Sequence, residues 1–213
     1  MVTIELKVAI FSSMLDVEEG TQSALNEAGM LLTQESLKRF DTDGSPILTV
    51  PVKWTSKGQV GKIYQTPYGE ASVERHVYQN SEGDKPYCPL DRAARIVSSS
   101  TPRFAKMVSH KVAINATTVV QRDLEDNHGR KVSRKFVHQT VETVGAIAQL
   151  KEESWEYERP KMERPIASVA TGIDGTCMFF SQDGWREAMT GTISLYAEDG
   201  ERQHTMYIGG APE

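Results

Sequence analysis

The chain has 213 residues, of which 38% are hydrophobic and 25% are charged, as in an ordinary globular protein of one large or two small domains. No apolar run approaches about 18 residues, so we expect no membrane-spanning helix. The net charge of −5 argues against nucleic-acid binding, but residues 92–138 carry ten Lys/Arg and only three Asp/Glu. Such a basic block is either a phosphate-binding surface or a solvated helix face.

Residues 1–46 are predicted to form an N-terminal strand and a helix. The alternation of Val2, Ile4, Leu6, Val8 and Ile10 indicates a strand rather than a secretion signal, because no basic segment precedes an apolar one. Apolar residues then recur at helical spacing over 12–40, and the segment 41–46, with Gly44 and Pro46, ends the pattern.

Residues 47–90 are predicted to form an antiparallel β meander. Strands over 62–65 and 71–79 flank a Thr-Pro-Tyr-Gly turn at 66–69, and a third short strand is expected over 85–90. The meander is rich in tyrosine. Cross-strand aromatic packing explains this composition, and a platform on which nucleic-acid bases stack is the alternative.

Residues 91–159 are predicted to be helical. Thr101-Pro102 starts one helix, Gly129 ends a second in the left-handed conformation, and Ser133 caps a third. The apolar face of the first carries Phe104, Met107, Val108 and Val112, and the buried stripe of the third carries Phe136, Val137, Thr140, Val141, Val144, Ile147 and Ala148.

The last two of these helices form a helix-turn-helix candidate, because a short glycine turn joins them. Four cations open the third helix, and there they can reach phosphates or guanine edges: Arg130, Lys131, Arg134 and Lys135. The alternative is ordinary packing of a helical hairpin.

Residues 166–213 are predicted to form three consecutive antiparallel strands joined by Asp-Gly turns, so the fold class is α+β. Asp174 lies on the first of these strands. A carboxylate on a buried strand needs a partner, and a divalent metal is one.

The two cysteines, Cys88 and Cys177, have no neighbour at metal or redox-motif spacing, which favours a reduced, cytoplasmic setting.

Several short sequence segments of this chain resemble those of bacterial insertion-sequence transposases of the ISKra type, a branch of the DDE transposases. They are GIDGTCM at 172–178, DGWREAM at 183–189, GTISLY at 191–196 and GERQHT at 200–205, preceded by YQTPYGE at 64–70, VERHVY at 73–78 and YCPL at 87–90. The resemblance implies that 166–213 begins a ribonuclease-H-like catalytic domain. It also implies that Asp174 is the first catalytic and Mg²⁺-binding acid and that the partner is the DNA of a transposon inverted repeat.

In that family the second Asp and the Glu follow the third strand, beyond the residues of this sequence. We therefore expect a fragment of a transposase, inactive alone in DNA strand transfer, whose incomplete sheet invites self-association. Glu187 is a weaker candidate for a second ligand facing Asp174. Two alternatives stay open: a non-catalytic DNA-binding or regulatory protein, and a structural or interaction domain without a nucleic-acid role.

Overall fold

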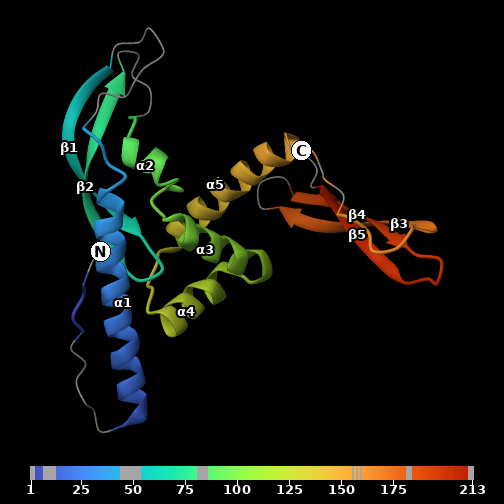
Figure 1. Ribbon diagram of the computed structural model, residues 1–213, viewed down its shortest axis with the longest axis horizontal. Coiled ribbons are helices and arrows are strands. Elements are labelled where there is room, and N and C mark those ends of the chain that lie inside the picture. Colours follow the sequence, from blue (N-terminus) through green and yellow to red (C-terminus); the bar gives the residue numbers. More distant parts are fainter. Residues whose placement is uncertain are drawn as a thin grey trace. The chain divides into compact units, whose positions relative to one another are not determined.

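The computed structural model describes residues 3–6, 13–43, 54–80, 86–154, 156, 158, 160–180 and 184–210. Their fold is α+β, as the sequence predicts, and the chain divides into two compact units, residues 1–155 and 156–213 (Figure 1). Within the described ranges, no helix has the length and apolar character needed to span a membrane.

The first unit begins with the long helix α1, Met14–Lys38. Ser13 caps it, because its side-chain oxygen accepts a hydrogen bond from the backbone N–H of Asp16 at 3.2 Å. The predicted helix is thus confirmed. Of the predicted N-terminal strand, residues 3–6 are not in a strand and the rest lies outside the described residues.

Two antiparallel strands follow, β1 (Trp54–Gln65) and β2 (Glu70–Asn80). The turn between them is held by Thr66, whose hydroxyl accepts from the backbone N–H groups of Tyr68 at 3.1 Å and Gly69 at 3.0 Å. Helix α1 approaches this turn closely: a Cβ on Gly29 would lie 2.5 Å from Cγ of Tyr68. Any larger residue at position 29 would therefore push the helix away from the turn.

The predicted third strand of the meander is wrong. Tyr87 makes only a single bridge with Tyr78, through two backbone hydrogen bonds of 2.9 and 2.8 Å. The short helix α2, Pro89–Ala93, begins directly afterwards. The reason is Pro89, which has no N–H to give to a sheet and whose fixed φ suits the first turn of a helix.

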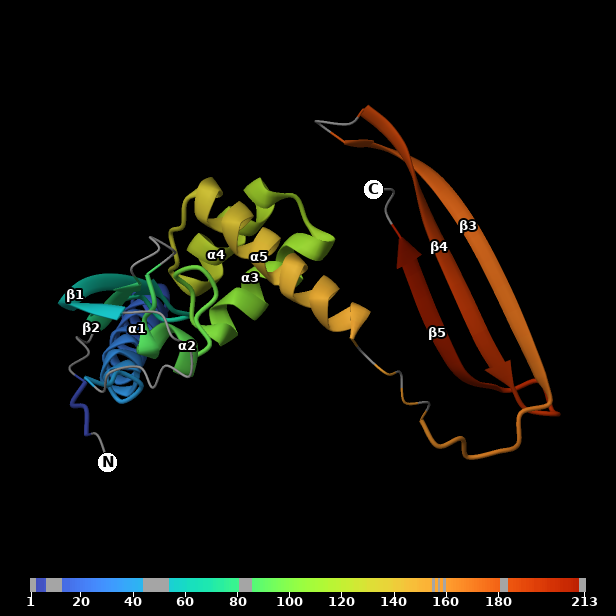
Figure 2. The ribbon, with the colours of Figure 1, turned by 90° about the horizontal axis from the view of Figure 1, so that it is seen from above.

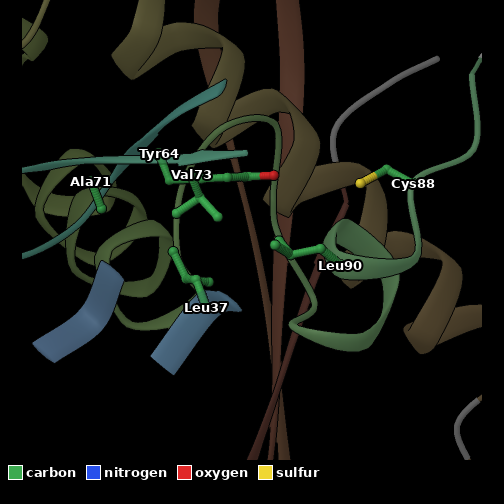
Figure 3. Packing of buried hydrophobic residues seen from close by; sticks show 6 residues of the cluster. All are labelled: Leu37, Tyr64, Ala71, Val73, Cys88 and Leu90. Carbon is green, nitrogen blue, oxygen red and sulfur yellow. The ribbon is translucent and has the colours of Figure 1, made fainter. Parts of the chain in front are cut away.

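One core joins α1, the two-stranded sheet and α2. Leu37 comes from the helix, Leu90 from α2, and the sheet strands contribute Tyr64, Ala71 and Val73 (Figure 3). Cys88 completes the cluster as a small buried side chain. This core fixes the turn at 66–69, which matters for the candidate site below.

The helical part consists of α3 (Pro102–Ile114), α4 (Thr117–His128) and α5 (Arg134–Glu153), which pack together in Figure 2. The predicted boundaries are confirmed: Gly129 ends α4 with φ of 61°, and the Ser133 side chain accepts from the Phe136 N–H at 3.1 Å. The helices share a core of Phe104, Val108, Val120, Leu124, Val132 and Val137. The predicted stripe of α5 is only partly buried, because Ile147 and Ala148 are exposed.

The second unit holds the predicted three antiparallel strands in sequence order: β3 (Ser168–Phe180), β4 (Gly184–Tyr196) and β5 (Arg202–Gly210) (Figure 2). Gly200 turns the chain from β4 to β5 with φ of 81°, a conformation that favours glycine. Paired residues of neighbouring strands lie on the same side of the sheet, so the register decides which residues share a side.

Candidate nucleic-acid interface and carboxylate site

The turn between α4 and α5 is a fixed structure within the first unit. Gly129 leaves α4 in the left-handed conformation, and its N–H bonds to the carbonyl of Glu125 at 3.1 Å. Gln121 donates from Nε2 to the carbonyl of Val132 at 2.8 Å, which holds the end of the turn against α4. The start of α5 is therefore set by local capping together with one side-chain bond.

Arg130 is buried inside this turn, with only 6% of its surface exposed. Its Nε donates to the carbonyl of Thr66 at 2.9 Å, and one terminal nitrogen donates to Oε1 of Gln65 at 2.6 Å. The guanidinium also lies 5.4 Å from the ring centre of Phe104, and burial lowers the pKa of Arg130. Because these contacts hold the guanidinium inside the fold, Arg130 is not available to contact DNA, and the prediction that it does so is wrong.

The other three predicted cations are exposed at the start of α5: Lys131, Arg134 and Lys135. Lys131 lies 3.4 Å from Glu125, but both side chains are well exposed and such a pair contributes little. Arg134 donates to Nε2 of His138 at 3.3 Å. Three cations next to the N-terminal end of a helix, where backbone N–H groups already attract anions, can bind phosphates.

An acidic cleft limits how far this cationic surface extends. The cleft lies between α1 and the end of α4, has a volume of about 900 Å³, and is lined by Glu18, Glu19, Glu27, Glu125 and Asp126 among others. A DNA backbone would be repelled there. Any duplex bound by the α4–α5 turn would therefore extend along the α5 side.

The aromatic residues of the two-stranded sheet are mostly interior. Tyr64 is fully buried and Tyr78 is 5% exposed, whereas the ring of Trp54 packs edge-on against Tyr87 at 5.8 Å. Buried rings cannot receive bases, so the base-stacking alternative is not supported at Tyr64 and Tyr78, and core packing accounts for them.

Asp174 lies in the middle of β3 and is exposed. It pairs with Thr190 of β4, and Thr190 in turn pairs with Gly209 of β5. The side of the sheet that bears Asp174 is lined by hydroxyl groups, and we call it the polar side: Thr176, Thr190, Thr192, Ser194 and Thr205.

Glu187 does not face Asp174. It pairs with Cys177, three positions further along β3, and this odd number of positions places it on the opposite side of the sheet. Its carboxylate lies over Gly175 there, since a Cβ on Gly175 would be 2.6 Å from Oε1 of Glu187. The expectation that Glu187 is a second ligand beside Asp174 is wrong.

The surroundings of Asp174 do not fit a complete Mg²⁺ site. Mg²⁺ requires six oxygen ligands in near-octahedral geometry, usually with more than one carboxylate or a substrate phosphate. In the part of the chain that the structure describes, no three acid, His or Cys side chains are grouped closely enough to hold a metal ion. Asp174 and the neighbouring threonines supply only one carboxylate, which is too few ligands to hold Mg²⁺.

No protein-family model matches the chain, and no curated protein matches it.

Proposed function

We propose that this chain is the DNA-binding part of a DDE-type transposase, working in the bacterial cytoplasm. In this proposal Lys131, Arg134 and Lys135 contact the phosphates of a transposon inverted repeat. The observation that carries the proposal is the exposure of these three cations on a capped, fixed turn at the start of α5. The basic segment 92–138 and the transposase-like sequence segments around Asp174 support it.

The test is a binding titration with a duplex that carries the terminal repeat of the genetic element encoding the chain, together with a scrambled duplex of equal composition. The triple variant Lys131→Ala, Arg134→Ala and Lys135→Ala is expected to weaken binding. It should reduce the slope of log K against log salt by roughly 2 to 3, because each lost phosphate contact removes about 0.9.

A control with the same net charge removes three exposed cations from outside the basic segment 92–138, Arg39, Lys57 and Arg202. This control should retain most of the affinity and the salt slope. An unchanged slope in the first triple variant, or equal losses in both, would reject the proposed interface. Equal binding to both duplexes would retain DNA binding and reject recognition of the inverted repeat.

In this proposal Asp174 is the first acid of the transposase site, and the chain binds DNA without cutting it. Asp174→Ala should leave the affinity for the repeat duplex unchanged, because the acid lies on the sheet and not on the α4–α5 turn. Mg²⁺-dependent nicking of the duplex by the wild-type chain, lost in Asp174→Ala, would contradict the non-catalytic part of the proposal. A non-catalytic DNA-binding protein of this kind would compete with a complete transposase for the same repeats.

A second candidate function is an interaction domain without a nucleic-acid role. It is favoured by the side of the β3–β4–β5 sheet opposite Asp174, which we call the apolar side: Val169, Ile173, Phe179, Trp185, Met189 and Ile208. Ile173 is 79% exposed and Trp185 is 71% exposed, and an exposed apolar surface of this kind, interrupted here at Glu187, is typical of protein contacts. Absence of binding to either duplex would favour this candidate.

A further inference from the structure

An apolar groove of the first unit runs between α3 and α5. It has a volume of about 910 Å³, and its walls are formed by Ile96, Val97, Ala105, Val144 and Ile147 among others. Ile147 is the residue at which the predicted buried stripe of α5 comes to the surface. The stripe continues past the core with nothing packed on it in the described chain, so the groove offers an apolar surface for another element.

The rim of the groove is cationic. Arg95, Lys106, Lys151 and His110 belong to its lining, and no Asp or Glu is among the described residues that line it. Arg95 adopts a left-handed conformation with φ of 51°, uncommon for a residue with a side chain, as the chain leaves α2. An apolar floor with a cationic rim fits an amphipathic helix that carries acids beside its apolar stripe.

Helix α1 has this chemistry on a face that is exposed among the described residues of its unit. Leu25 is 53% exposed and Leu32 is 46% exposed. They are seven residues apart and so share a helix face, about 10 Å from each other along the axis. Val144 and Lys151 of the groove have the same spacing along α5.

Acids extend this exposed face at both ends. Glu18 precedes Leu25 by seven residues and Glu35 follows Leu32 by three, so both lie near the leucine stripe. Across the whole helix, five acidic residues and one lysine give a net charge of −4. Glu35 is paired with Lys38 at the exposed surface, a weak contact that a stronger partner can replace.

We propose that the α3–α5 groove receives helix α1 of a second copy of this chain. Leu25 and Leu32 enter the apolar floor, and Glu18 and Glu35 meet the cationic rim at Lys106 and Lys151. Each copy carries both the helix and the groove. The contact therefore either closes into a dimer by reciprocal exchange or continues from copy to copy.

Duplex DNA is a less suitable occupant. Its backbone is charged and hydrated, so it gains little from an apolar floor. Lys131, Arg134 and Lys135 at the α4–α5 turn are exposed cations outside this groove and its apolar floor, so they suit phosphates better.

The test measures the mass of the full chain by sedimentation over a wide concentration range. The groove variant is Lys106→Glu with Lys151→Glu, and the helix variant is Glu18→Lys with Glu35→Lys. Each variant alone places like charges at the contact, so self-association should weaken by at least about tenfold. Circular dichroism should show unchanged helix content, because all four side chains are exposed.

An equimolar mixture of the two variants provides the decisive measurement. The acidic groove of one then meets the basic helix of the other, and the unchanged basic groove meets the unchanged acidic helix. Association should recover in the mixture, and Leu32→Asp in one partner should weaken it again. Lack of recovery, or unaltered association in either variant alone, would overturn the proposal. Loss of DNA binding in the groove variant with unchanged self-association would assign the groove to phosphates instead.

Discussion

Nε of Arg130 donates a hydrogen bond to the backbone carbonyl of Thr66 at 2.9 Å. This bond joins the turn before α5 to the turn between β1 and β2, 64 positions earlier in the chain. The same guanidinium bonds to Gln65 and packs against Phe104. One buried cation thus links the helical part of the first unit to its sheet.

Arg130→Ala should therefore lower the stability of the fold. We expect a loss of about 2 to 3 kcal/mol in the free energy of unfolding, because the buried carbonyl of Thr66 loses its charged donor and Phe104 loses a cation. Urea denaturation measures this loss. Lys131→Ala is the matched control and should cost less than about 0.5 kcal/mol. Equal stabilities of the two variants would contradict the structural role of Arg130.

Asp91 should be a second point of high sensitivity. Its carboxylate accepts from the hydroxyl of Tyr64 at 2.5 Å and from Arg75 at 2.6 Å, and Lys62 lies 3.3 Å away. Burial raises the pKa of Tyr64 well above its ordinary value, and Asp91 adds to the effect. The tyrosine is thus protonated and able to donate throughout the neutral and moderately alkaline range.

Asp91→Ala should cost about 2 to 4 kcal/mol of unfolding free energy, because two cations and a buried hydroxyl lose their acceptor. Tyr64→Phe should cost only about 1 kcal/mol, since the ring remains in the core. Asp199→Ala is the control: that carboxylate pairs with Arg164 at the surface, and its loss should be nearly neutral. A neutral Asp91→Ala would show that the network contributes little.

The contact between α3 and α4 should depend on pH through Asp123. Nζ of Lys111 forms an ion pair with Oδ2 of Asp123 at 2.5 Å and Asn127 donates to Oδ1 at 2.8 Å, and these contacts hold the pKa of Asp123 below its ordinary value of 3.8. A carboxyl group with a lowered pKa in the folded state stabilises the fold above its unfolded-state pKa. This contribution is lost as the pH falls through the folded-state value.

Asp123→Asn should therefore be less stable than the wild type near neutral pH, by about 0.5 to 1 kcal/mol at this partly exposed site. The difference should shrink as the pH falls below about 4 and should vanish below the lowered pKa of the folded wild-type carboxyl, where that group is protonated. Denaturation curves collected at both pH values give this comparison. A difference that stays constant with pH would mean that Asp123 does not act through its charge.

The apolar side of the β3–β4–β5 sheet should bind hydrophobic dyes and promote self-association. The double variant Ile173→Lys with Trp185→Lys should reduce the fluorescence of bound anilinonaphthalene sulfonate, because two highly exposed apolar side chains are replaced by charges. Tyr207 lies on the polar side and is 78% exposed, so Tyr207→Lys is the matched control. Equal effects at both positions would argue against a sided surface.

The parts of the fold that follow local rules could be predicted from the sequence. Gly129 and Ser133 mark the α4–α5 turn because their roles depend only on neighbouring backbone groups. Pro89 ends the strand-like pattern, whereas the predicted strand over 85–90 includes it and is therefore too long. Side-chain placement at long range could not be predicted. The burial of Arg130 depends on Thr66 and Gln65, which are far away in the sequence.

The candidate carboxylate site shows the same division. The strand bearing Asp174 was predictable from its apolar residues and its Asp-Gly turn. The side occupied by Glu187 depends on the register of β4 against β3, which its own sequence does not reveal. The groove between α3 and α5 could not be predicted from any short stretch of sequence, because its cations come from three separate parts of the chain.

The pairing of Asp174 with Thr190 favours the observed register of β3 on β4 over a register shifted by one residue. If β3 slid by a single position along β4, the carboxylate would share a side of the sheet with Trp185 and Met189 of β4, and Ile173 would share a side with the β4 threonines. Both exchanges mix charged or polar groups with apolar ones, so the shifted pairing is less favourable than the observed one. Asp174 thus contributes to the alignment of the strands around it.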